Sequence, residues 1–269
     1  MRLDVELVNR GLARSRSQAA TLIERGRVLI NGKAARKSSQ PVEPEQKILV
    51  LEAVDYASRA GHKLAAALDE FSEIDVVGKL ALDVGASTGG FTDVLLRRGA
   101  SKVIALDVGH DQLVPALVEN PNVINLERVN ARDLDSELLE NLTGMRGVAK
   151  KLGIIVADLS FISLTLVLPQ LLRLAPQAEF VVLIKPQFEV GKQSLSASGV
   201  VNDHRLRAAA INQVISCVSE EGAAVRGLTV SKLPGTHGNI EYLMWISKSE
   251  RPNASEWSKR VAAIARESE

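Results

Sequence analysis

Five short apolar segments, four of which end in a charged residue, constrain the fold of this chain more than any other feature. They cover residues 79–83, 102–107, 123–126, 153–158 and 180–185. Segments that are apolar throughout, and that alternate with helical patterns, are typical of a parallel sheet whose two faces are covered by helices. Leu64, Leu68 and Phe71 give one such helical pattern, because they recur at positions i, i+4 and i+7. We therefore expect an α/β domain with a mostly parallel, Rossmann-like sheet.

The last two strand patterns, residues 224–231 and 240–246, depart from a plain dinucleotide-binding fold. They follow a helical segment at residues 205–221, and the connection between them is too short to hold a crossover helix. Without a crossover helix, the two strands have to run antiparallel. An antiparallel edge on a mostly parallel sheet favours the class I methyltransferase version of the fold.

The chain of 269 residues is 46% hydrophobic, which allows a full α/β core and one small extra module. Its net charge of +1 conceals an asymmetry. The first 40 residues hold nine Lys and Arg against three Asp and Glu, a net charge of +6, so the rest of the chain carries −5. A compact basic head on a mildly acidic body indicates contact with a polyanion. We expect domains at residues 1–53 and 63–269, joined by a linker at residues 54–62.

The head has the pattern of a small α+β module. Helical segments end at Gly11 and at Gly26, a strand covers residues 28–30, and Asn31-Gly32 is a strong signal for a tight hairpin. These segments resemble the RNA-binding module of the S-four type, first seen in a ribosomal protein of the small subunit. The head has no Phe or Trp, which fits recognition of phosphates and shape in folded RNA better than stacking on single strands. A basic face that binds nothing is the alternative. The expected RNA-binding residues are Arg10, Arg14, Arg16, Lys33, Arg36 and Lys37.

The sequence argues against several classes of protein. The chain starts without an apolar signal segment, and no stretch approaches 18 uninterrupted apolar residues. The single Cys217 excludes an internal disulfide framework, and its place in a helical pattern suits a small buried side chain. The four His are too scattered to suggest a metal cluster. We expect a soluble, cytoplasmic protein with no metal and no membrane partner, and a monomer is favoured.

A glycine-rich turn, Asp83-Val-Gly-Ala-Ser-Thr-Gly-Gly-Phe91, follows the first apolar strand and leads into a helix. A dinucleotide fingerprint has its second Gly two residues after the first, where the pyrophosphate approaches the backbone. Here that position is Ser87, so the turn favours S-adenosylmethionine, which has no pyrophosphate, over a nicotinamide cofactor. Asp107, at the end of the second strand, is placed to accept both ribose hydroxyls, and Asn130, after the third strand, is placed to contact adenine.

Two roles for Asp83 remain open, because its carboxylate can either order the turn or lie near the amine of the methionine moiety. The expected cofactor-binding residues are Asp83, Gly85, Ala86, Ser87, Thr88, Gly89, Gly90, Phe91, Asp107, Val108, Asn130, Ala131 and Asp158.

Two lysines and two carboxylates, Lys63, Asp158, Lys185 and Glu241, each lie in a short, unusual motif. Asp158 and Lys185 stand at strand ends, where sheets of this kind bind their ligands. A ribose 2′-hydroxyl is weakly acidic, so methylation of its oxygen needs a base or a group that orients its lone pair. Lys185 can lose its charge if it is desolvated beside Lys63, and the two carboxylates can orient both amines. Each residue alone could be structural or a surface residue, but their joint occurrence favours a catalytic set.

Other common methyl acceptors lack their motifs in this chain. Enzymes that methylate exocyclic amines of bases carry Asn/Asp-Pro-Pro and an aromatic residue, whereas this chain has Asp158-Leu-Ser-Phe161. Methylation of cytosine C5 needs a nucleophilic Cys, and Cys217 lies in a helix away from the strand ends. An oxygen or a small-molecule acceptor remains, and the lysines and carboxylates favour oxygen.

Over almost its whole length the chain closely resembles the TlyA, or hemolysin A, family of bacterial ribosomal RNA 2′-O-methyltransferases, which have an FtsJ-like body. Besides the glycine turn, the resemblance is carried by Arg59-Ala-Gly-His-Lys63, Val156-Ala-Asp-Leu-Ser-Phe-Ile-Ser163 and Ile184-Lys-Pro-Gln-Phe-Glu-Val-Gly-Lys192. It implies that Lys63, Asp158, Lys185 and Glu241 are the Lys-Asp-Lys-Glu tetrad of FtsJ-like enzymes. It also implies methylation of cytidine in 16S or 23S ribosomal RNA, or in both, and an effect on susceptibility to capreomycin and viomycin. The tail with Trp257, Val261 and Ile264 looks like the extension of the longer, dual-substrate members.

Two other functions stay open at this point. The family name suggests a pore-forming or membrane-acting hemolysin, although the short apolar strands suit a parallel core and the tail helix carries Arg260 and Arg266. The chain could also be a catalytically inactive RNA-binding factor in ribosome assembly. The intact tetrad and glycine turn argue for the enzyme.

Overall fold

The computed structural model describes residues 1–24, 26–50, 56–191, 195–196 and 198–267. The chain divides into two compact units, Met1–Arg59 and Ala60–Glu269.

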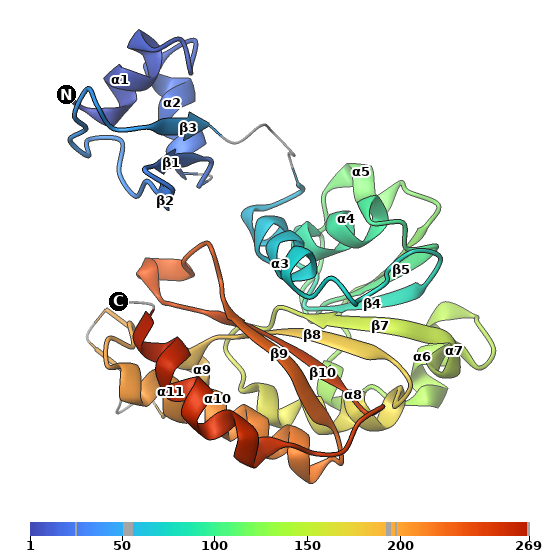
Figure 1. Ribbon diagram of the computed structural model, residues 1–269. Coiled ribbons are helices and arrows are strands. Elements are labelled where there is room, and N and C mark those ends of the chain that lie inside the picture. Colours follow the sequence, from blue (N-terminus) through green and yellow to red (C-terminus); the bar gives the residue numbers. More distant parts are fainter. Residues whose placement is uncertain (25, 51–55, 192–194, 197, 268–269) are drawn as a thin grey trace. The chain divides into compact units, whose positions relative to one another are not determined.

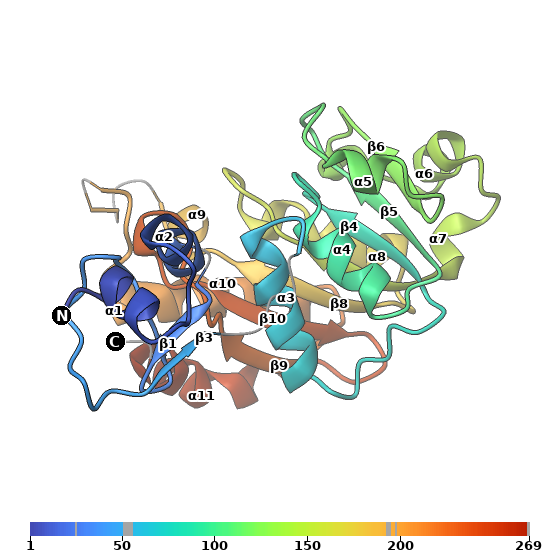
Figure 2. The same ribbon diagram turned by 90° about the horizontal axis from the view of Figure 1, so that it is seen from above.

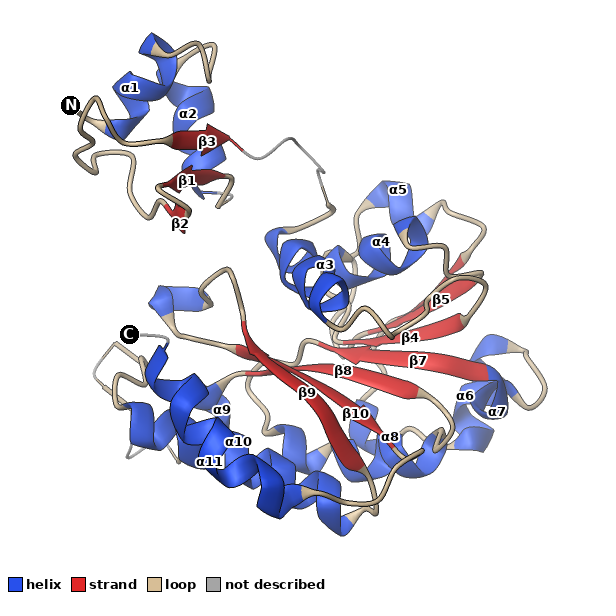
Figure 3. Ribbon diagram, viewed as in Figure 1, coloured by secondary structure: helices blue, strands red, loops and turns tan. Residues whose placement is uncertain are grey.

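The first unit is a small α+β module with its own core (Figure 3). Asn31 and Gly32 both have positive φ angles, 49° and 81°, as a tight type I′ hairpin requires. Leu3, Leu7 and Val28 are fully buried in the core of the unit. The predicted hairpin is confirmed, whereas the third strand was not predicted. The elements are α1 (Leu3–Asn9), α2 (Arg16–Glu24), β1 (Val28–Ile30), β2 (Lys33–Ala34) and β3 (Ile48–Val50), in an antiparallel sheet of order β2-β1-β3.

The second unit contains a seven-stranded sheet of order β6-β5-β4-β7-β8-β10-β9. The first five strands in this order run parallel, and β10 is antiparallel to both β8 and β9. The predicted antiparallel edge of a mostly parallel sheet is therefore confirmed. The strands are β4 (Leu80–Val84), β5 (Lys102–Leu106), β6 (Val123–Leu126), β7 (Leu152–Ala157), β8 (Glu179–Ile184), β9 (Ala224–Val230) and β10 (Tyr242–Ser247).

Helices cover both faces of this sheet: α3 and α4 lie on one face, and α8, α10 and α11 lie on the other (Figures 1 and 2). All five residues of β4 are buried, which explains why the central strands read as unbroken apolar runs. The helices are α3 (Arg59–Glu70), α4 (Gly90–Arg97), α5 (Pro115–Val118), α6 (Ser136–Thr143), α7 (Val148–Lys151), α8 (Leu168–Leu174), α9 (Pro186–Glu189), α10 (His204–Glu220) and α11 (Ala254–Glu267), with short 3-10 turns at Ala131–Asp133, Leu164–Leu166 and Thr236–Gly238.

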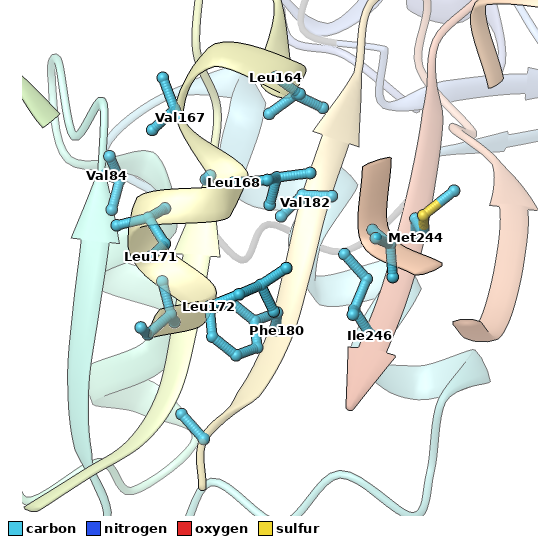
Figure 4. Close-up of a cluster of buried hydrophobic side chains, with 14 of the residues drawn as sticks. Val84, Leu164, Val167, Leu168, Leu171, Leu172, Phe180, Val182, Met244 and Ile246 are labelled. Atoms are coloured by element: carbon cyan, nitrogen blue, oxygen red, sulfur yellow. The ribbon is translucent and has the colours of Figure 1, made fainter. Parts of the chain in front are cut away.

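The core on one face of the sheet is formed by α8 against β8 and β10 (Figure 4). Leu168 and Leu171 of α8 pack with Phe180 of β8, and all three are fully buried. Trp257 and Val261 of α11 belong to the same cluster, so the tail helix packs on the body as expected from the sequence. This core holds rigid the strand ends that carry the candidate site.

The linker predicted at residues 54–62 differs from the structure in one respect. Helix α3 begins at Arg59, so residues 59–62 form its first turn. The apolar spacing showed only the later turns of this helix, because its first turn contains Gly61 and the polar His62 in place of apolar residues. Residues 51–55 lie outside the described part of the chain.

Candidate active site

Two ion pairs, one buried and one partly exposed, join the four residues of the predicted tetrad. Lys63 Nζ lies 2.5 Å from Glu241 Oε2, and Lys185 Nζ lies 2.6 Å from Asp158 Oδ1. The Lys63 and Glu241 side chains are only 7% and 2% exposed, whereas those of Lys185 and Asp158 are 11% and 17% exposed. The second pair is therefore the one that is more accessible to a substrate.

The two pairs lie together where the parallel strands β7 and β8 end, at the carboxyl edge of the sheet. Asp158 follows β7, Lys185 follows β8, and Glu241 precedes β10. Tyr242 pairs with Ile184 across the antiparallel strands β10 and β8, so Glu241 and Lys185 stand opposite each other one step beyond the ladder. Lys63 reaches Glu241 from the second turn of α3.

The amine of Lys185 has a second partner, the hydroxyl of Ser160. Lys185 Nζ donates to Ser160 Oγ at 2.8 Å, and Ser160 itself is exposed. An ammonium group has three N–H donors, and a neutral amine has two donors and one lone pair. Asp158 is in ion-pair contact with the amine, and Ser160 is its hydrogen-bond acceptor, so an N–H or the lone pair of the nitrogen is left for another group. It is this position that an incoming hydroxyl group can use.

The glycine turn between β4 and α4 lies beside this edge. Gly85 has a φ angle of +83°, and a Cβ atom built on it would lie 2.7 Å from the carbonyl oxygen of Asp158. Ser87, at the place of the second Gly in a dinucleotide fingerprint, has a φ angle of +48°. The turn therefore packs directly on the segment that carries Asp158, and a side chain at position 85 would push the two apart.

Asp107 is tied to the glycine turn by its carboxylate. Its Oδ2 atom accepts the Ser87 amide at 2.8 Å, and its Oδ1 atom accepts the Gly109 amide at 2.7 Å. These bonds fix the carboxylate at the end of β5, and each oxygen keeps a lone pair for a further donor. Val108, next to it, is 72% exposed.

Asp83 is a fully buried carboxylate at the start of the turn. Its Oδ2 atom accepts the Thr92 hydroxyl at 2.6 Å, whereas its Oδ1 atom has no hydrogen-bond partner. Burial, only partly opposed by the bonds from Thr92, raises the pKa of Asp83 to about 7, and the neighbouring carboxylates of Asp158 and Asp107 act in the same direction. A buried acceptor without a partner fits a cationic group of a ligand in this place.

The other predicted cofactor residues are divided between the surface and the interior. Asn130 is exposed, and its side chain accepts the Arg132 amide at 3.1 Å, which caps a 3-10 turn. Ala86, Phe91 and Ala131 are buried.

The predicted RNA-binding residues of the first unit fall into two groups. Arg14, Lys33, Arg36 and Lys37 are exposed and have no acidic partner in the described part of the chain. Arg16 is also exposed but lies 2.9 Å from the carboxylate of Asp4. The nearby guanidinium groups of Arg2 and Arg16 hold the pKa of that carboxyl well below its usual range.

Arg10, by contrast, is engaged within the unit. Its guanidinium group contacts Glu6 at 2.7 Å and donates to the carbonyl oxygens of Gln46 and Pro44 at 2.8 and 2.9 Å. The structure therefore gives Arg10 an intramolecular role, which its place in the sequence did not indicate.

Two residues beside the ion pair of Lys185 and Asp158 were not predicted from the sequence as site residues, namely Ser160 and Phe161. Phe161 is 92% exposed, has a φ angle of +65°, and packs on Phe188 with the rings tilted at 48° and their centroids 5.3 Å apart. A bulky residue held in the left-handed region and in solvent is unusual and points to function. The signal was present in the sequence, since the chain has only 3% aromatic residues and one of them follows Asp158 by three positions.

The loop before Glu241 was also missed, because it was interpreted only as a connection between strands. A Cβ atom at Gly235 would lie 1.9 Å from Glu241 Oε1, so only glycine leaves room for the carboxylate. Asn239 is buried and ties this loop to residues 199–201, since it accepts the Val201 amide at 3.0 Å and donates to the Gly199 carbonyl at 3.1 Å.

Two further kinds of site are absent from the residues that the structure describes. No group of three or more His, Cys, Asp or Glu side chains there could hold a metal ion. None of the helices in that part of the chain combines the length and the apolar character needed to cross a membrane.

Comparison with known proteins places both units in families. Residues 56–248 match the FtsJ-like methyltransferase family, and residues 1–48 match the S4 domain, the S-four-type module expected from the sequence. The chain is therefore a methyltransferase of the FtsJ-like class. Its sheet has seven strands and an antiparallel edge, and the site combines a glycine turn with two lysine–carboxylate ion pairs.

Individual relatives narrow this class. The chain is 47% identical, over 91% of its length and 89% of the relative's, to the 16S/23S rRNA (cytidine-2′-O)-methyltransferase TlyA of Mycobacterium tuberculosis. It is 41% identical to Hemolysin A of Brachyspira hyodysenteriae over 90% of the chain and 98% of the relative. A solved structure of a hemolysin-named protein from Streptococcus thermophilus aligns with a TM-score of 0.73 at 33% identity, covering 100% of this chain and 96% of the other. The chain belongs to the TlyA, or hemolysin A, family of methyltransferases, as the sequence motifs indicated.

Proposed function

We propose that this protein transfers the methyl group of S-adenosylmethionine to the 2′-hydroxyl of cytidine in ribosomal RNA. The observation that carries the proposal is the amine of Lys185, held by Asp158 and Ser160 at the edge of the sheet beside the glycine turn. The relative from M. tuberculosis is named for this reaction on 16S and 23S rRNA. The proposed substrates are 16S or 23S rRNA, or both, and α11 looks like the tail of the longer, dual-substrate members.

The residues around the glycine turn fit S-adenosylmethionine. The partnerless Oδ1 atom of buried Asp83 suits its ammonium group, and the lone pairs left on Asp107 suit its ribose hydroxyls. The amides at the start of α4 suit its carboxylate, because a helix N-terminus attracts anions. When bound, S-adenosylmethionine supplies an electrophilic methyl group, and the bond from that carbon to sulfur breaks as the bond to the acceptor oxygen forms.

Lys185 is proposed to handle the proton of the acceptor hydroxyl. As a neutral amine it donates to Ser160 and stays in contact with Asp158, and its lone pair accepts the proton that the 2′-oxygen loses. As an ammonium group it donates an N–H to that oxygen and orients the oxygen's lone pair for attack. In both forms the main contribution is alignment of the oxygen with the methyl carbon.

Lys63 and Glu241 are proposed to support Lys185 rather than to touch the substrate. Their side chains are almost completely buried and contact each other. Lys63 adds a positive charge near Lys185, which favours loss of a proton from the second amine. Glu241 stands opposite Lys185 in the strand register, and its carboxylate keeps the Lys63 amine in place there.

Ribosomal RNA binding is assigned to the basic residues of the S4 domain and to Phe161. Arg14, Lys33, Arg36 and Lys37 are exposed, have no acidic partner among the residues that the structure describes, and carry charges suited to phosphate groups. Phe161 presents an exposed aromatic ring near the ion pair of Lys185 and Asp158. Unstacked bases bind to aromatic rings of this kind. The same modification would make ribosomes of a cell with this protein susceptible to capreomycin and viomycin, so loss of the gene is expected to lower susceptibility.

One assay tests the reaction and the role of Lys185 together. Purified protein is incubated with methyl-labelled S-adenosylmethionine and with unmodified 30S or 50S subunits, and the RNA is digested to nucleosides. We expect label in 2′-O-methylcytidine and a loss of at least about 1,000-fold in turnover for Lys185→Ala, with unchanged cofactor affinity. Lys150→Ala, at an exposed lysine of α7, is the matched control and is expected to be fully active. Label on a base, or an active Lys185→Ala variant, contradicts the proposal.

A further inference from the structure

Glu189 is a buried carboxylate that the proposed reaction does not use. It ends α9, four residues after Lys185, and it is 7% exposed. Burial raises the pKa of Glu189, although bonds from Leu164 and Ser163 act in the opposite direction. Keeping a carboxylate in such a place is costly, so its contacts require an explanation.

Both oxygens of Glu189 accept hydrogen bonds from the segment that follows β7. The Ser163 hydroxyl donates to Oε2 at 2.5 Å, and the Leu164 amide donates to Oε1 at 2.9 Å. Ser163 in turn caps the 3-10 turn Leu164–Leu166 by accepting the Thr165 amide at 3.2 Å. The carboxylate therefore holds the far end of residues 158–164.

The near end and the middle of the same segment are held by Lys185 and Phe188. Lys185 contacts Asp158 and Ser160, and the ring of Phe188 lies against that of Phe161. Three residues, Lys185, Phe188 and Glu189, thus join residues 158–164 to residues 185–189. The bond from the Leu164 amide to Glu189 is buried, whereas the bond from Lys185 to Ser160 is partly buried, and the contacts of Glu189 lie beyond the residues proposed to face the substrate.

We infer that Glu189 is a positioning residue, which anchors the segment 158–164 so that Asp158, Ser160 and Phe161 are presented correctly to Lys185 and to the RNA. This inference rests on the proposed function for its catalytic consequence, whereas the anchoring itself does not. An unanchored segment would let Asp158 and Ser160 move away from the amine, and displacements of about 1 Å at such a site cost about 100-fold in rate.

The anchor works through hydrogen bonds, which a glutamine can reproduce. In Glu189→Gln the amide oxygen still accepts from Leu164, and the amide nitrogen donates to Ser163 Oγ. The Ser163 hydroxyl can then donate to Thr165 Oγ1, which lies 2.7 Å away. Glu189→Ala removes both bonds and leaves the Ser163 hydroxyl and the Leu164 amide without their partner.

The experiment compares Glu189→Ala and Glu189→Gln with a control at the other end of β8. Glu179 also accepts two hydrogen bonds, from Trp245 Nε1 at 2.5 Å and from Ser247 Oγ at 3.2 Å, and it begins β8 away from the site. For each variant we would measure kcat, KM for subunits, cofactor affinity, melting temperature, and hydrogen exchange of the amides of residues 158–166.

We expect Glu189→Ala to lower kcat about 10- to 100-fold at unchanged cofactor affinity, and to speed exchange at residues 158–166. Glu189→Gln should stay within about threefold of the wild type in kcat, because it keeps both bonds. Glu179→Ala should lower the melting temperature and leave kcat and the exchange of residues 158–166 unchanged.

Three results would overturn the inference. Equal losses of kcat in Glu189→Ala and Glu179→Ala would show a general structural role. A Glu189→Gln variant as inactive as Glu189→Ala would show that the charge matters rather than the anchor. Unchanged exchange at residues 158–166 in Glu189→Ala would show that no anchor exists. If the wild-type protein methylates no RNA, the proposed function fails, and the exchange measurement still decides whether Glu189 anchors the segment.

Discussion

The two units of this protein present their charged side chains in opposite ways. In the methyltransferase body, the four tetrad side chains are no more than 17% exposed and are joined in two ion pairs. In the S4 domain, Arg14, Lys33, Arg36 and Lys37 are exposed and have no acidic partner within the described residues. A buried, paired charge acts at one point through geometry, whereas an exposed charge acts through a field that salt screens. We expect large and specific effects from substitutions in the body, and small, additive, salt-dependent effects in the S4 domain.

The largest effect is expected from breaking the pair of Lys63 and Glu241. Glu241→Ala leaves the Lys63 amine buried without its carboxylate, which should cost about 3–5 kcal/mol of unfolding free energy. Urea denaturation measures this loss, and the methylation assay should show that activity is lost as well.

A double variant separates stability from chemistry at this pair. Lys63→Met combined with Glu241→Leu removes both charges and should recover most of the stability, because apolar replacements of a buried pair are often neutral. Activity should stay lost, since no second positive charge remains near Lys185. A stable double variant that methylates RNA at the wild-type rate would show that the pair serves folding alone.

Asp83 makes the free energy of unfolding of the methyltransferase body depend on pH. Its pKa of about 7 lies above the ordinary value of 3.8, so the folded protein binds a proton in this interval that the unfolded chain has lost. The stabilisation is complete below about pH 4 and falls as pH rises toward 7, by at most about 1.4 kcal/mol per pH unit. Asp83→Asn should remove this slope, which urea denaturation between pH 5 and about 8 can measure.

Cofactor binding should show the opposite trend. The ammonium group of S-adenosylmethionine favours the ionised carboxylate, so affinity should rise from about pH 6 to about 8 in the wild type and much less in Asp83→Asn. Asp75→Asn, at an exposed carboxylate, is the control for both measurements. A wild-type affinity that does not change over this range would remove Asp83 from the cofactor site.

Phe161 is an exposed residue of the body. Its substitution shows whether such a residue affects catalysis, as the buried residues of the body do, or affects RNA binding, as the S4 domain does. Phe161→Ala should raise KM for ribosomal subunits about tenfold, since stacking of one base contributes ~1–3 kcal/mol. Because stacking is not ionic, the loss should be the same at low and high salt. Phe161→Trp should retain activity, and Val77→Ala, at a 69% exposed residue outside the site, should have no effect. A change of kcat with unchanged KM would argue against stacking.

From the sequence we predicted the strands of the body and proposed one set of two lysines and two carboxylates, but the sequence did not show which of them pair. The strands were visible because a parallel sheet buried on both faces requires unbroken apolar runs. The pairing of Lys63 with Glu241 depends on the register of Tyr242 against Ile184, which is fixed only when β10 packs between β8 and β9. The partner of Ser160 and the exposure of Phe161 are of the same kind, since both depend on how residues 158–164 fold back on α9.

From the sequence of the S4 domain we predicted the hairpin, but we could not distinguish basic residues that are held within the unit from those that are exposed. Arg10 differs from Arg14 only in what surrounds it in space, since the carbonyl groups of Glu43, Pro44 and Gln46 accept bonds from its guanidinium group. Composition counts both as positive charges. Only tertiary structure shows that the charge of Arg10 is used inside the unit.

The smallest effects are expected from the exposed charges of the S4 domain. Arg14→Ala, Lys33→Ala and Arg36→Ala should each weaken RNA binding about two- to fivefold at moderate salt. Each should also reduce the slope of log affinity against log salt by about 0.7–0.9, because one phosphate contact is lost. Arg10→Ala should instead lower the melting temperature of the unit and leave the slope unchanged, since its guanidinium group binds backbone carbonyls. If Arg10→Ala changes the slope as much as Arg14→Ala does, the intramolecular bonds of Arg10 yield to RNA, and the contrast between held and exposed charges no longer applies in this unit.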